Sequence, residues 1–142
     1  MRLFLDANIL FSAAHSENSH AYVLVRFAEA GYCVILGSPH AIGEATRNLE
    51  LKSRNFHGRL ARILRRIERV PEAPAELVQW AAANGLPAKD APILAAAAHA
   101  RADLLVTGDR RDFGPLFGIT LHGVRIATLG DAVELVLKSA IS

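Results

Sequence analysis

The sequence predicts a three-layer α/β domain, in which a short parallel sheet is flanked by helices. Short apolar segments of strand length alternate along the chain with longer segments of helical periodicity. Strands that are separated by helices favour a parallel sheet covered on both faces. A length of 142 residues suits one core, so we expect residues 1–142 to form a single domain.

The first half of the chain is predicted to contain two strands and four helices, at residues 3–5 (strand), 22–30, 33–36 (strand), 39–49, 56–69 and 75–83. Ser38 and Pro39 begin the second of these helices, because serine is a favoured N-cap and proline is tolerated at the first helical position. The helix over residues 56–69 is predicted from apolar residues at helical spacing, with arginine on its other faces.

The second half is predicted to contain an Ala-rich helix, two strands and a closing helix, at residues 90–100, 103–107 (strand), 124–126 (strand) and 129–137. Residues 113–117 are expected to form a loop or a short helix. We find no internal repeat, no low-complexity tract and no linker in the sequence.

The composition argues against a membrane protein or a disulfide-stabilised one. Hydrophobic residues make up 51% of the chain, but charged residues interrupt every apolar run before the roughly 20 residues that a transmembrane helix needs. The N-terminus does not resemble a secretory signal. Cys33 is the only cysteine, so no internal disulfide can form. We therefore expect a cytoplasmic protein.

The positive charges are concentrated in one segment, residues 47–69, although the net charge is only +2. Half of the 16 basic residues lie there: Arg47, Lys52, Arg54, Arg59, Arg62, Arg65, Arg66 and Arg69. Clustered basic residues indicate a polyanionic partner. A solvated pair of amphipathic helices, or an arm that docks an acidic peptide, would explain the same pattern.

Four acidic residues are placed so that they can meet at one edge of the predicted sheet. Asp6 follows the first strand and Asp109 follows the strand at residues 103–107. Glu44 and Asp90 lie near the N-terminal ends of helices that start from the same edge. Functional groups in open parallel sheets collect at the carboxyl ends of the strands. The topology therefore allows all four carboxylates to converge.

Each acid alone has a purely structural explanation, as a turn residue, a helix N-cap or a partner of the helix dipole. Asp90 fits such an explanation least well, because it shares a helix face with the apolar residues Ile93 and Leu94. An unpaired carboxylate at the edge of a core is costly. A divalent cation would offset that cost, and ligands that are all carboxylate oxygens favour Mg²⁺ or Mn²⁺ over zinc.

Four motifs in this order resemble the PIN-domain ribonucleases, and the chain length is similar to that of the VapC-type toxins of bacterial toxin–antitoxin pairs. The motifs are Leu-Asp-Ala-Asn (5–8), Glu-Ala-Thr-Arg-Asn (44–48), Asp-Ala-Pro-Ile-Leu-Ala-Ala-Ala (90–97) and Leu-Val-Thr-Gly-Asp-Arg-Arg-Asp-Phe (105–113). Together they span most of the chain. The resemblance implies a PIN-like fold, with residues 47–69 as a basic helical arm.

The resemblance also implies a metal-binding and catalytic set made of Asp6, Glu44, Asp90 and Asp109. Asn8 and Thr107 are then expected to orient the carboxylates or a water molecule, with local turn capping as the alternative for both. Asp112 is not expected to be a metal ligand. One or two Mg²⁺ or Mn²⁺ ions would activate a water molecule and stabilise the leaving oxygen. No histidine or serine is placed to act as the nucleophile.

The activity implied by the resemblance is endonucleolytic cleavage of RNA, leaving a 5′-phosphate and a 3′-hydroxyl. It further implies a VapBC-type toxin with a cognate antitoxin, and a homodimer. The residues expected to bind RNA are Arg47, Arg62, Arg65 and Arg66. Arg47 and Asn48 lie three and four residues after Glu44 on the same helix face, where they could contact substrate phosphate. Arg47 could instead only pair with Glu44.

Three other functions compete with this interpretation. Phosphatases of the haloacid dehalogenase type need a second aspartate two residues after the first, but position 8 is asparagine, so we exclude them. A solitary RNA-processing PIN nuclease fits the same residues. A catalytically inactive PIN scaffold would be expected to lack one or more of the four acids, and all four are present.

Overall fold

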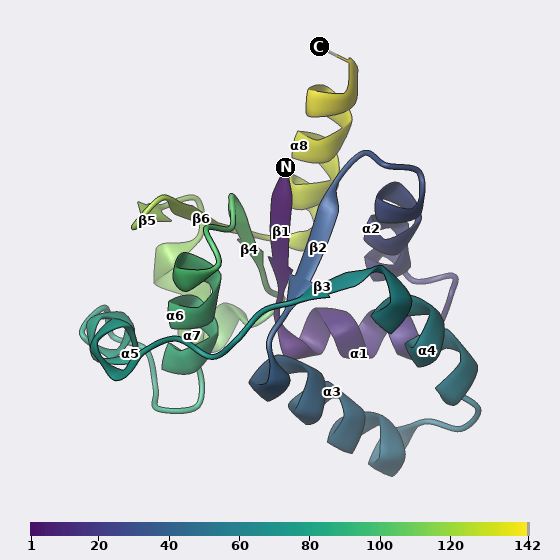
Figure 1. The fold of residues 1–142 in the computed structure, drawn as a ribbon, viewed down its shortest axis with the longest axis horizontal. Helices are drawn as coiled ribbons and strands as arrows, with labels where there is room; N and C mark the ends of the chain where they lie inside the picture. The colour runs from purple at the N-terminus through teal and green to yellow at the C-terminus, as the bar shows by residue number, and fades with distance from the viewer. Residues whose placement is uncertain (142) are drawn as a thin grey trace.

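A six-stranded sheet runs through the centre of the molecule in the computed structural model, which describes residues 1–141 (Figure 1). The strand order is β3-β2-β1-β4-β6-β5. Their bounds are β1 Arg2–Leu5, β2 Val34–Gly37, β3 Ile67–Arg69, β4 Leu104–Val106, β5 Thr120–Leu121 and β6 Val124–Ala127. All neighbouring strands are parallel except β5 and β6. The predicted three-layer α/β fold is confirmed.

Eight α-helices and one 3₁₀ helix flank this sheet within residues 1–141. They are α1 Ala7–His15, α2 His20–Glu29, α3 Pro39–Lys52, α4 His57–Arg66, α5 Ala75–Ala82, α6 Ala91–His99, α7 Arg110–Phe113, η1 Gly114–Leu116 and α8 Leu129–Ile141. Helices α2, α3 and α4 each pack on α1, and α5 packs on α6. No helix in this part of the chain is long and apolar enough to cross a membrane.

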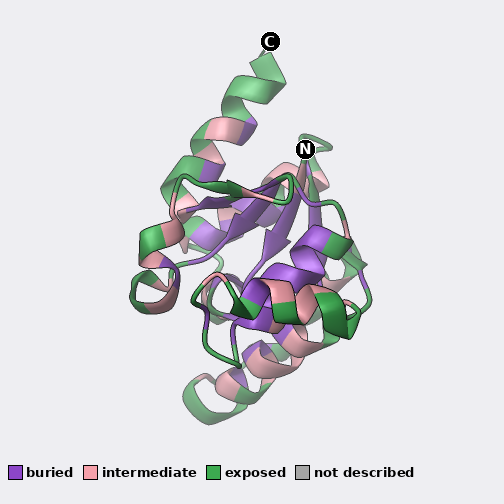
Figure 2. Ribbon diagram, turned by 90° about the vertical axis from the view of Figure 1, so that its left-hand side faces the viewer, coloured by how far each residue is buried: buried purple, intermediate pink, exposed green. Residues whose placement is uncertain are grey.

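The core lies between the sheet and the inner faces of the helices, as the burial colours in Figure 2 show. Leu3, Phe4 and Leu5 of β1 are fully buried, because β1 lies between β2 and β4 in the middle of the sheet. Helix α6 is buried along nearly its whole length, and its alanines allow close packing. The apolar composition therefore reflects a packed core.

The predicted helix over residues 56–69 is wrong at its C-terminal end. Helix α4 ends at Arg66, and Ile67–Arg69 form β3, the edge strand that pairs with β2. Ile67 occupies the apolar position expected of a helix, but it is buried beside Ile35 of β2. A single buried isoleucine is consistent with both the helical period and the strand period of apolar residues. Only the pairing with β2 shows that Ile67 belongs to a strand.

Three further elements were not predicted: α1, β5 and α7, which starts at Arg110 directly after Asp109. Helix α1 follows β1 without a loop, and its buried residues Ile9, Leu10, Ala13 and Ala14 recur at helical spacing. Strand β5 is two residues long and forms a hairpin with β6, too short to produce a pattern. Helix α1 changes the setting of Asp6, which lies between a strand and a helix.

The register of the sheet brings distant parts of the sequence together at one edge. Leu5 at the end of β1 pairs with Val106 at the end of β4, and the Asp6 amide donates to the Val106 carbonyl over 3.0 Å. Ser38 caps α3 at the end of β2, as predicted, by accepting a hydrogen bond from the Ala41 amide. The carboxyl ends of β1, β2 and β4 thus lead into α1, α3 and α7 side by side.

Candidate metal centre

Asp6 is a buried carboxylate with hydrogen bonds to both of its oxygens. It is 4% exposed and is the N-cap of α1, where Oδ1 accepts from the Ala7 amide at 2.7 Å. Oδ2 accepts from the Thr107 hydroxyl at 2.7 Å and from the Asn8 side-chain Nδ2 at 3.3 Å. Asp6 is therefore both a capping residue and a carboxylate held in a fixed orientation.

The surroundings of Asp6 favour its neutral form. Burial raises the pKa of Asp6, while the hydrogen bonds from Thr107 and Ala7 act in the opposite direction. The nearby negative charges of Glu44 and Asp109 raise the pKa of Asp6 further. A positive charge beside Asp6 would relieve both effects.

The two predicted supporting residues, Asn8 and Thr107, join this aspartate to the end of β4. The Thr107 hydroxyl accepts from the Asp109 amide at 3.1 Å while donating to Asp6. The Asn8 side chain donates to Asp6 and accepts from the Gly108 amide at 2.9 Å. Only Thr107 makes a local turn contact, through the Asp109 amide, whereas Asn8 lies in α1 and reaches the turn after β4.

All four predicted acids line one open cavity of about 400 Å³ at this edge of the sheet. Its lining is Asp6, Ala7, Asn8, Phe11, Glu44, Asn48, Lys52, Lys89, Asp90 and Asp109. Glu44, Asn48 and Lys52 are spaced four residues apart, so α3 presents one face to the cavity. The structure therefore brings the four acids together at one cavity, as the predicted topology allowed.

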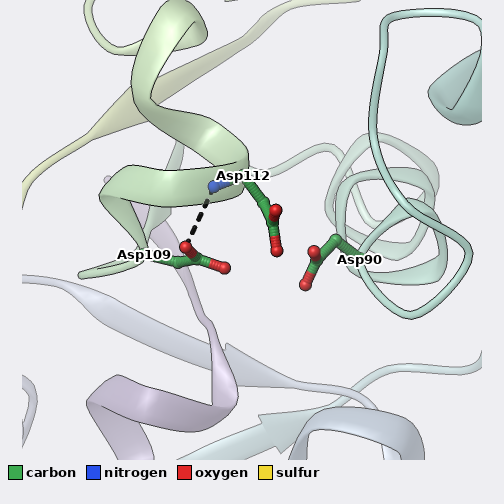
Figure 3. A group of neighbouring side chains, drawn as sticks. All are labelled: Asp90, Asp109 and Asp112. Carbon is green, nitrogen blue, oxygen red and sulfur yellow. Dashed lines mark hydrogen bonds between the residues drawn. The ribbon is translucent and has the colours of Figure 1, made fainter.

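Asp109 enters the cavity from the turn after β4. Its Oδ1 caps α7 by accepting from the amides of Arg111 at 3.1 Å and Asp112 at 3.0 Å. The bond to Asp112 is the dashed line in Figure 3. The other oxygen, Oδ2, lies 3.8 Å from the Lys89 ammonium.

Asp90 does not cap the helix that it precedes. Its side chain makes no capping hydrogen bond to α6, although the residue is only 6% exposed. One carboxylate oxygen each from Asp90, Asp109 and Asp112 lies within 4.8 Å of the others, and Figure 3 shows the three side chains converging. Asp112, which was not expected to be a ligand, thus belongs to this acid cluster.

A lysine that sequence reasoning missed holds the cluster together. The Lys89 ammonium lies 3.1 Å from Asp90 Oδ2, 2.9 Å from Asp112 Oδ2 and 3.8 Å from Asp109 Oδ2. The hydrogen bond to Asp112 raises the pKa of Lys89 above its ordinary value and lowers that of Asp112. The position of Lys89 next to Asp90 was the only signal in the sequence.

The pKa values of Asp90 and Asp112 are shifted in opposite directions. Burial, aided by the hydrogen bond to Asp112, raises the pKa of Asp90 to about 6, although Lys89 opposes the shift. Asp112 is held ionised by Lys89 and by Asp90. At neutral pH the cluster therefore carries more negative charge than one ammonium can balance.

The donor set fits a hard divalent cation. Oxygens that bind one Mg²⁺ lie at most about 4.2 Å apart, and the three oxygens of the acid cluster lie within 4.8 Å of one another without a metal. Every side-chain donor in the cluster is a carboxylate oxygen, and the cluster already attracts a protein cation. Asp6 and Glu44 supply two further carboxylates at the same cavity.

None of the predicted RNA-binding arginines lines the cavity that contains the acids. Arg47 is exposed on α3 and does not line the cavity. Arg62 donates two hydrogen bonds to Glu29, at 2.8 and 2.9 Å, and its guanidinium lies 5.6 Å from the centre of the Tyr22 ring. Arg65 and Arg66 are exposed in the last turn of α4.

A family model described as "PIN domain" matches residues 2–111, which include all four acids. The chain belongs to the PIN-domain family. The match ends before β5, β6 and α8, yet both of those strands complete the same sheet. A search of curated protein sequences found no match to this PIN domain.

Solved structures share the fold over most of their length. VapBC2 from Rickettsia felis, bound to a DNA fragment from its promoter, has a TM-score of 0.62 and 19% identity, with 90% of this chain and 98% of that chain covered. PAE2754 from Pyrobaculum aerophilum gives 0.62 and 20%, with both chains fully covered. Mycobacterium tuberculosis VapC20, described as a sarcin-ricin loop cleaving toxin, gives 0.52 and 16%, covering 80% and 94%.

Proposed function

We propose that this PIN domain is a metal-dependent endoribonuclease that hydrolyses RNA phosphodiester bonds with Mg²⁺ or Mn²⁺. The observation that carries the proposal is the cavity in which Asp6, Glu44, Asp90 and Asp109 meet. Buried acids with a raised pKa in an open cavity are typical of a functional site. Membership of a nuclease family supports the same chemistry.

The residues have separate roles in this proposal. The four acids would hold the ions, and Asn8 and Thr107 keep the Asp6 carboxylate oriented. Bound there, one or two Mg²⁺ or Mn²⁺ ions would supply the Lewis acidity that phosphodiester hydrolysis requires. Water is the nucleophile, and the products are a 5′-phosphate and a 3′-hydroxyl.

We also propose that the protein is the toxin of a VapBC-type pair and binds a cognate antitoxin in the cell. Structures described as VapBC and FitAB complexes share its fold, and VapC20 is described as a cleaving toxin. A solitary RNA-processing nuclease has the same site. An open reading frame for a small antitoxin beside this gene would favour the toxin.

The test of the nuclease proposal is RNA cleavage by wild type and by Asp6→Asn. We expect wild type to cleave with Mg²⁺ or Mn²⁺ and to stop in excess EDTA. We expect Asp6→Asn to lose at least about 100-fold in rate, the scale seen when a group central to transition-state stabilisation is removed. Without metal, Asp6→Asn should be as stable as wild type or more stable, because a buried charge is gone.

Asp131→Asn is the matched control, because Asp131 is an exposed acid in the first turn of α8 and does not line the cavity. It should cleave like wild type. Wild-type cleavage that persists in EDTA would contradict metal dependence. Full metal-dependent activity in Asp6→Asn would remove Asp6 from the set of ligands.

A further inference from the structure

We propose that Lys89 is a tethered counter-ion that competes with the divalent cation for the acid cluster, and that bound RNA relieves this competition. In this inference, which rests on the proposed nuclease function, Lys89 is a positioning residue that couples metal binding to RNA binding.

The ammonium and a metal ion would need the same oxygens. Lys89 Nζ donates to Asp112 Oδ2 at 2.9 Å and to both oxygens of Asp90, at 3.1 and 3.3 Å. A cation bound to those oxygens at about 2.0–2.1 Å would lie next to the ammonium. Two positive charges at that separation repel strongly, so each site occupant must lower the affinity of the other.

The backbone of Lys89 is held by hydrogen bonds, while its side chain is largely exposed to solvent. The Lys89 carbonyl is hydrogen-bonded to the His40 ring at 3.1 Å, and the Asp90 amide closes a turn onto the Pro87 carbonyl at 2.9 Å. The Lys89 side chain, in contrast, is 62% exposed. Rotation about its side-chain bonds therefore moves the charge without moving the turn that carries Asp90.

RNA offers the ammonium another anion within the same cavity. Lys89 and Lys52 both line it, and a lysine binds phosphate as a point charge. When RNA phosphate draws Lys89 from Asp90 and Asp112, the oxygens become available to the metal. Coupling of this kind is reciprocal, so RNA must tighten metal binding as much as metal tightens RNA binding.

The first experiment measures Mn²⁺ affinity without RNA, from the electron paramagnetic resonance signal of free Mn²⁺, for wild type and Lys89→Met. We expect Lys89→Met to bind Mn²⁺ about three- to tenfold more tightly, the range that a few partly exposed ion pairs supply. Lys89→Arg keeps the charge and should restore affinity to near the wild-type value. Thermal unfolding without metal checks that each variant is folded.

Lys52→Met is the matched control, because it removes a lysine from the same cavity that makes no ion pair with the acid cluster in the described chain. It reports how much a general loss of positive charge contributes. We expect its Mn²⁺ affinity to change much less than that of Lys89→Met. Equal changes in the two variants, or weaker binding by Lys89→Met, would overturn the inference.

The second experiment repeats the titration with a phosphorothioate single-stranded RNA that resists hydrolysis. RNA should tighten Mn²⁺ binding by wild type, and clearly less by Lys89→Met, because that variant has no ammonium to displace. The same tightening in both proteins would overturn the coupling. If wild type binds Mn²⁺ and cleaves RNA while Lys89→Met matches Lys52→Met, this inference fails and the proposed function stands. If neither protein binds Mn²⁺, both fail.

Discussion

The hydroxyl of Thr107 connects two of the candidate metal ligands. The hydroxyl is fully buried, donates to Asp6 and accepts from the Asp109 amide. It therefore links the end of β1 to the turn after β4. A threonine at the end of a strand has an ordinary explanation as a turn residue, and only the paired ends of β1 and β4 give its hydroxyl two partners.

Replacing this threonine with valine tests the link, because valine keeps the shape and removes the hydroxyl. Thr107→Val leaves the Asp109 amide without its acceptor and takes one donor from buried Asp6. We expect a loss of about 1–3 kcal/mol in the free energy of unfolding. Urea denaturation in EDTA measures this change, with Thr107→Ser as the control that keeps the hydroxyl. A Thr107→Val protein as stable as wild type would show that the hydroxyl contributes nothing.

Lys89 and Asp112 illustrate what residue-level reading of the sequence misses. Neither residue lies on an apolar stripe or within a predicted strand end. Their side chains meet across 23 positions of sequence because α7 and the turn before α6 lie side by side. Three of the four acids were different, since Asp6, Asp90 and Asp109 each lie next to an element boundary that the sequence predicts, while Glu44 lies within the helix that follows Ser38.

The arginines of helix α4 fall into two groups, those that contact neighbouring helices and those that are exposed. Arg62 pairs with Glu29 of α2 and stacks near Tyr22, while Arg59 donates to the carbonyls of Ala14 and His15 at the end of α1. These arginines hold α4 against its neighbours. Arg65 and Arg66 are exposed at the end of the helix and are the better candidates for contacts with RNA.

The double variant Arg65→Gln/Arg66→Gln should therefore weaken RNA binding and leave stability unchanged. Each phosphate contact with single-stranded RNA contributes about 0.7 to the slope of log affinity against log salt, so losing two should reduce the slope by about 1.4. Fluorescence anisotropy at several salt concentrations measures this. Arg62→Gln should instead cost up to about 1 kcal/mol of stability, since its ion pair is partly exposed.

Arg125→Gln is the control for general loss of charge, because Arg125 is exposed on β6 and outside the basic segment. Its slope should match that of wild type. If the double variant also keeps the wild-type slope, the end of α4 is a solvated surface, the alternative that the sequence allowed.

The free energy of unfolding depends on pH, because burial in the fold raises the pKa of Asp90 and of Asp6. The folded protein binds a proton at Asp90 with a pKa of about 6, whereas an ordinary aspartate has a pKa of about 3.9. Between those values the folded state takes up more protons than the unfolded state, so stability falls as pH rises through 6. The raised pKa of Asp6 acts in the same direction.

We therefore expect the metal-free protein to become more stable as pH is lowered from about 7 to about 5. Below about 4.5 the trend should reverse, because Asp112, Glu29 and Glu68 have lowered pKa values and lose favourable interactions on protonation. Thermal unfolding in EDTA measures the effect against Asp90→Asn. A stability difference between the two proteins that does not vary with pH would contradict it.

The sequence by itself determined the alternation of strands and helices, and with it the parallel sheet, and it allowed the four acids to meet at one edge without requiring it. These features depend on local hydrophobic periodicity and on helix and strand boundaries, which are written in neighbouring residues. The confirmed N-cap at Ser38 is of the same kind. The order of the motifs was enough to indicate the PIN family.

Only the tertiary structure decided that Ile67 belongs to a strand, that Arg62 is paired, and that Lys89 lies among the acids. The partners are Ile35, Glu29 and Asp112, which are distant in the sequence. Such contacts depend on which elements pack side by side, and no local pattern specifies them. The physical reason is that the partners of a long side chain or an edge strand are the groups that lie next to it in the folded chain.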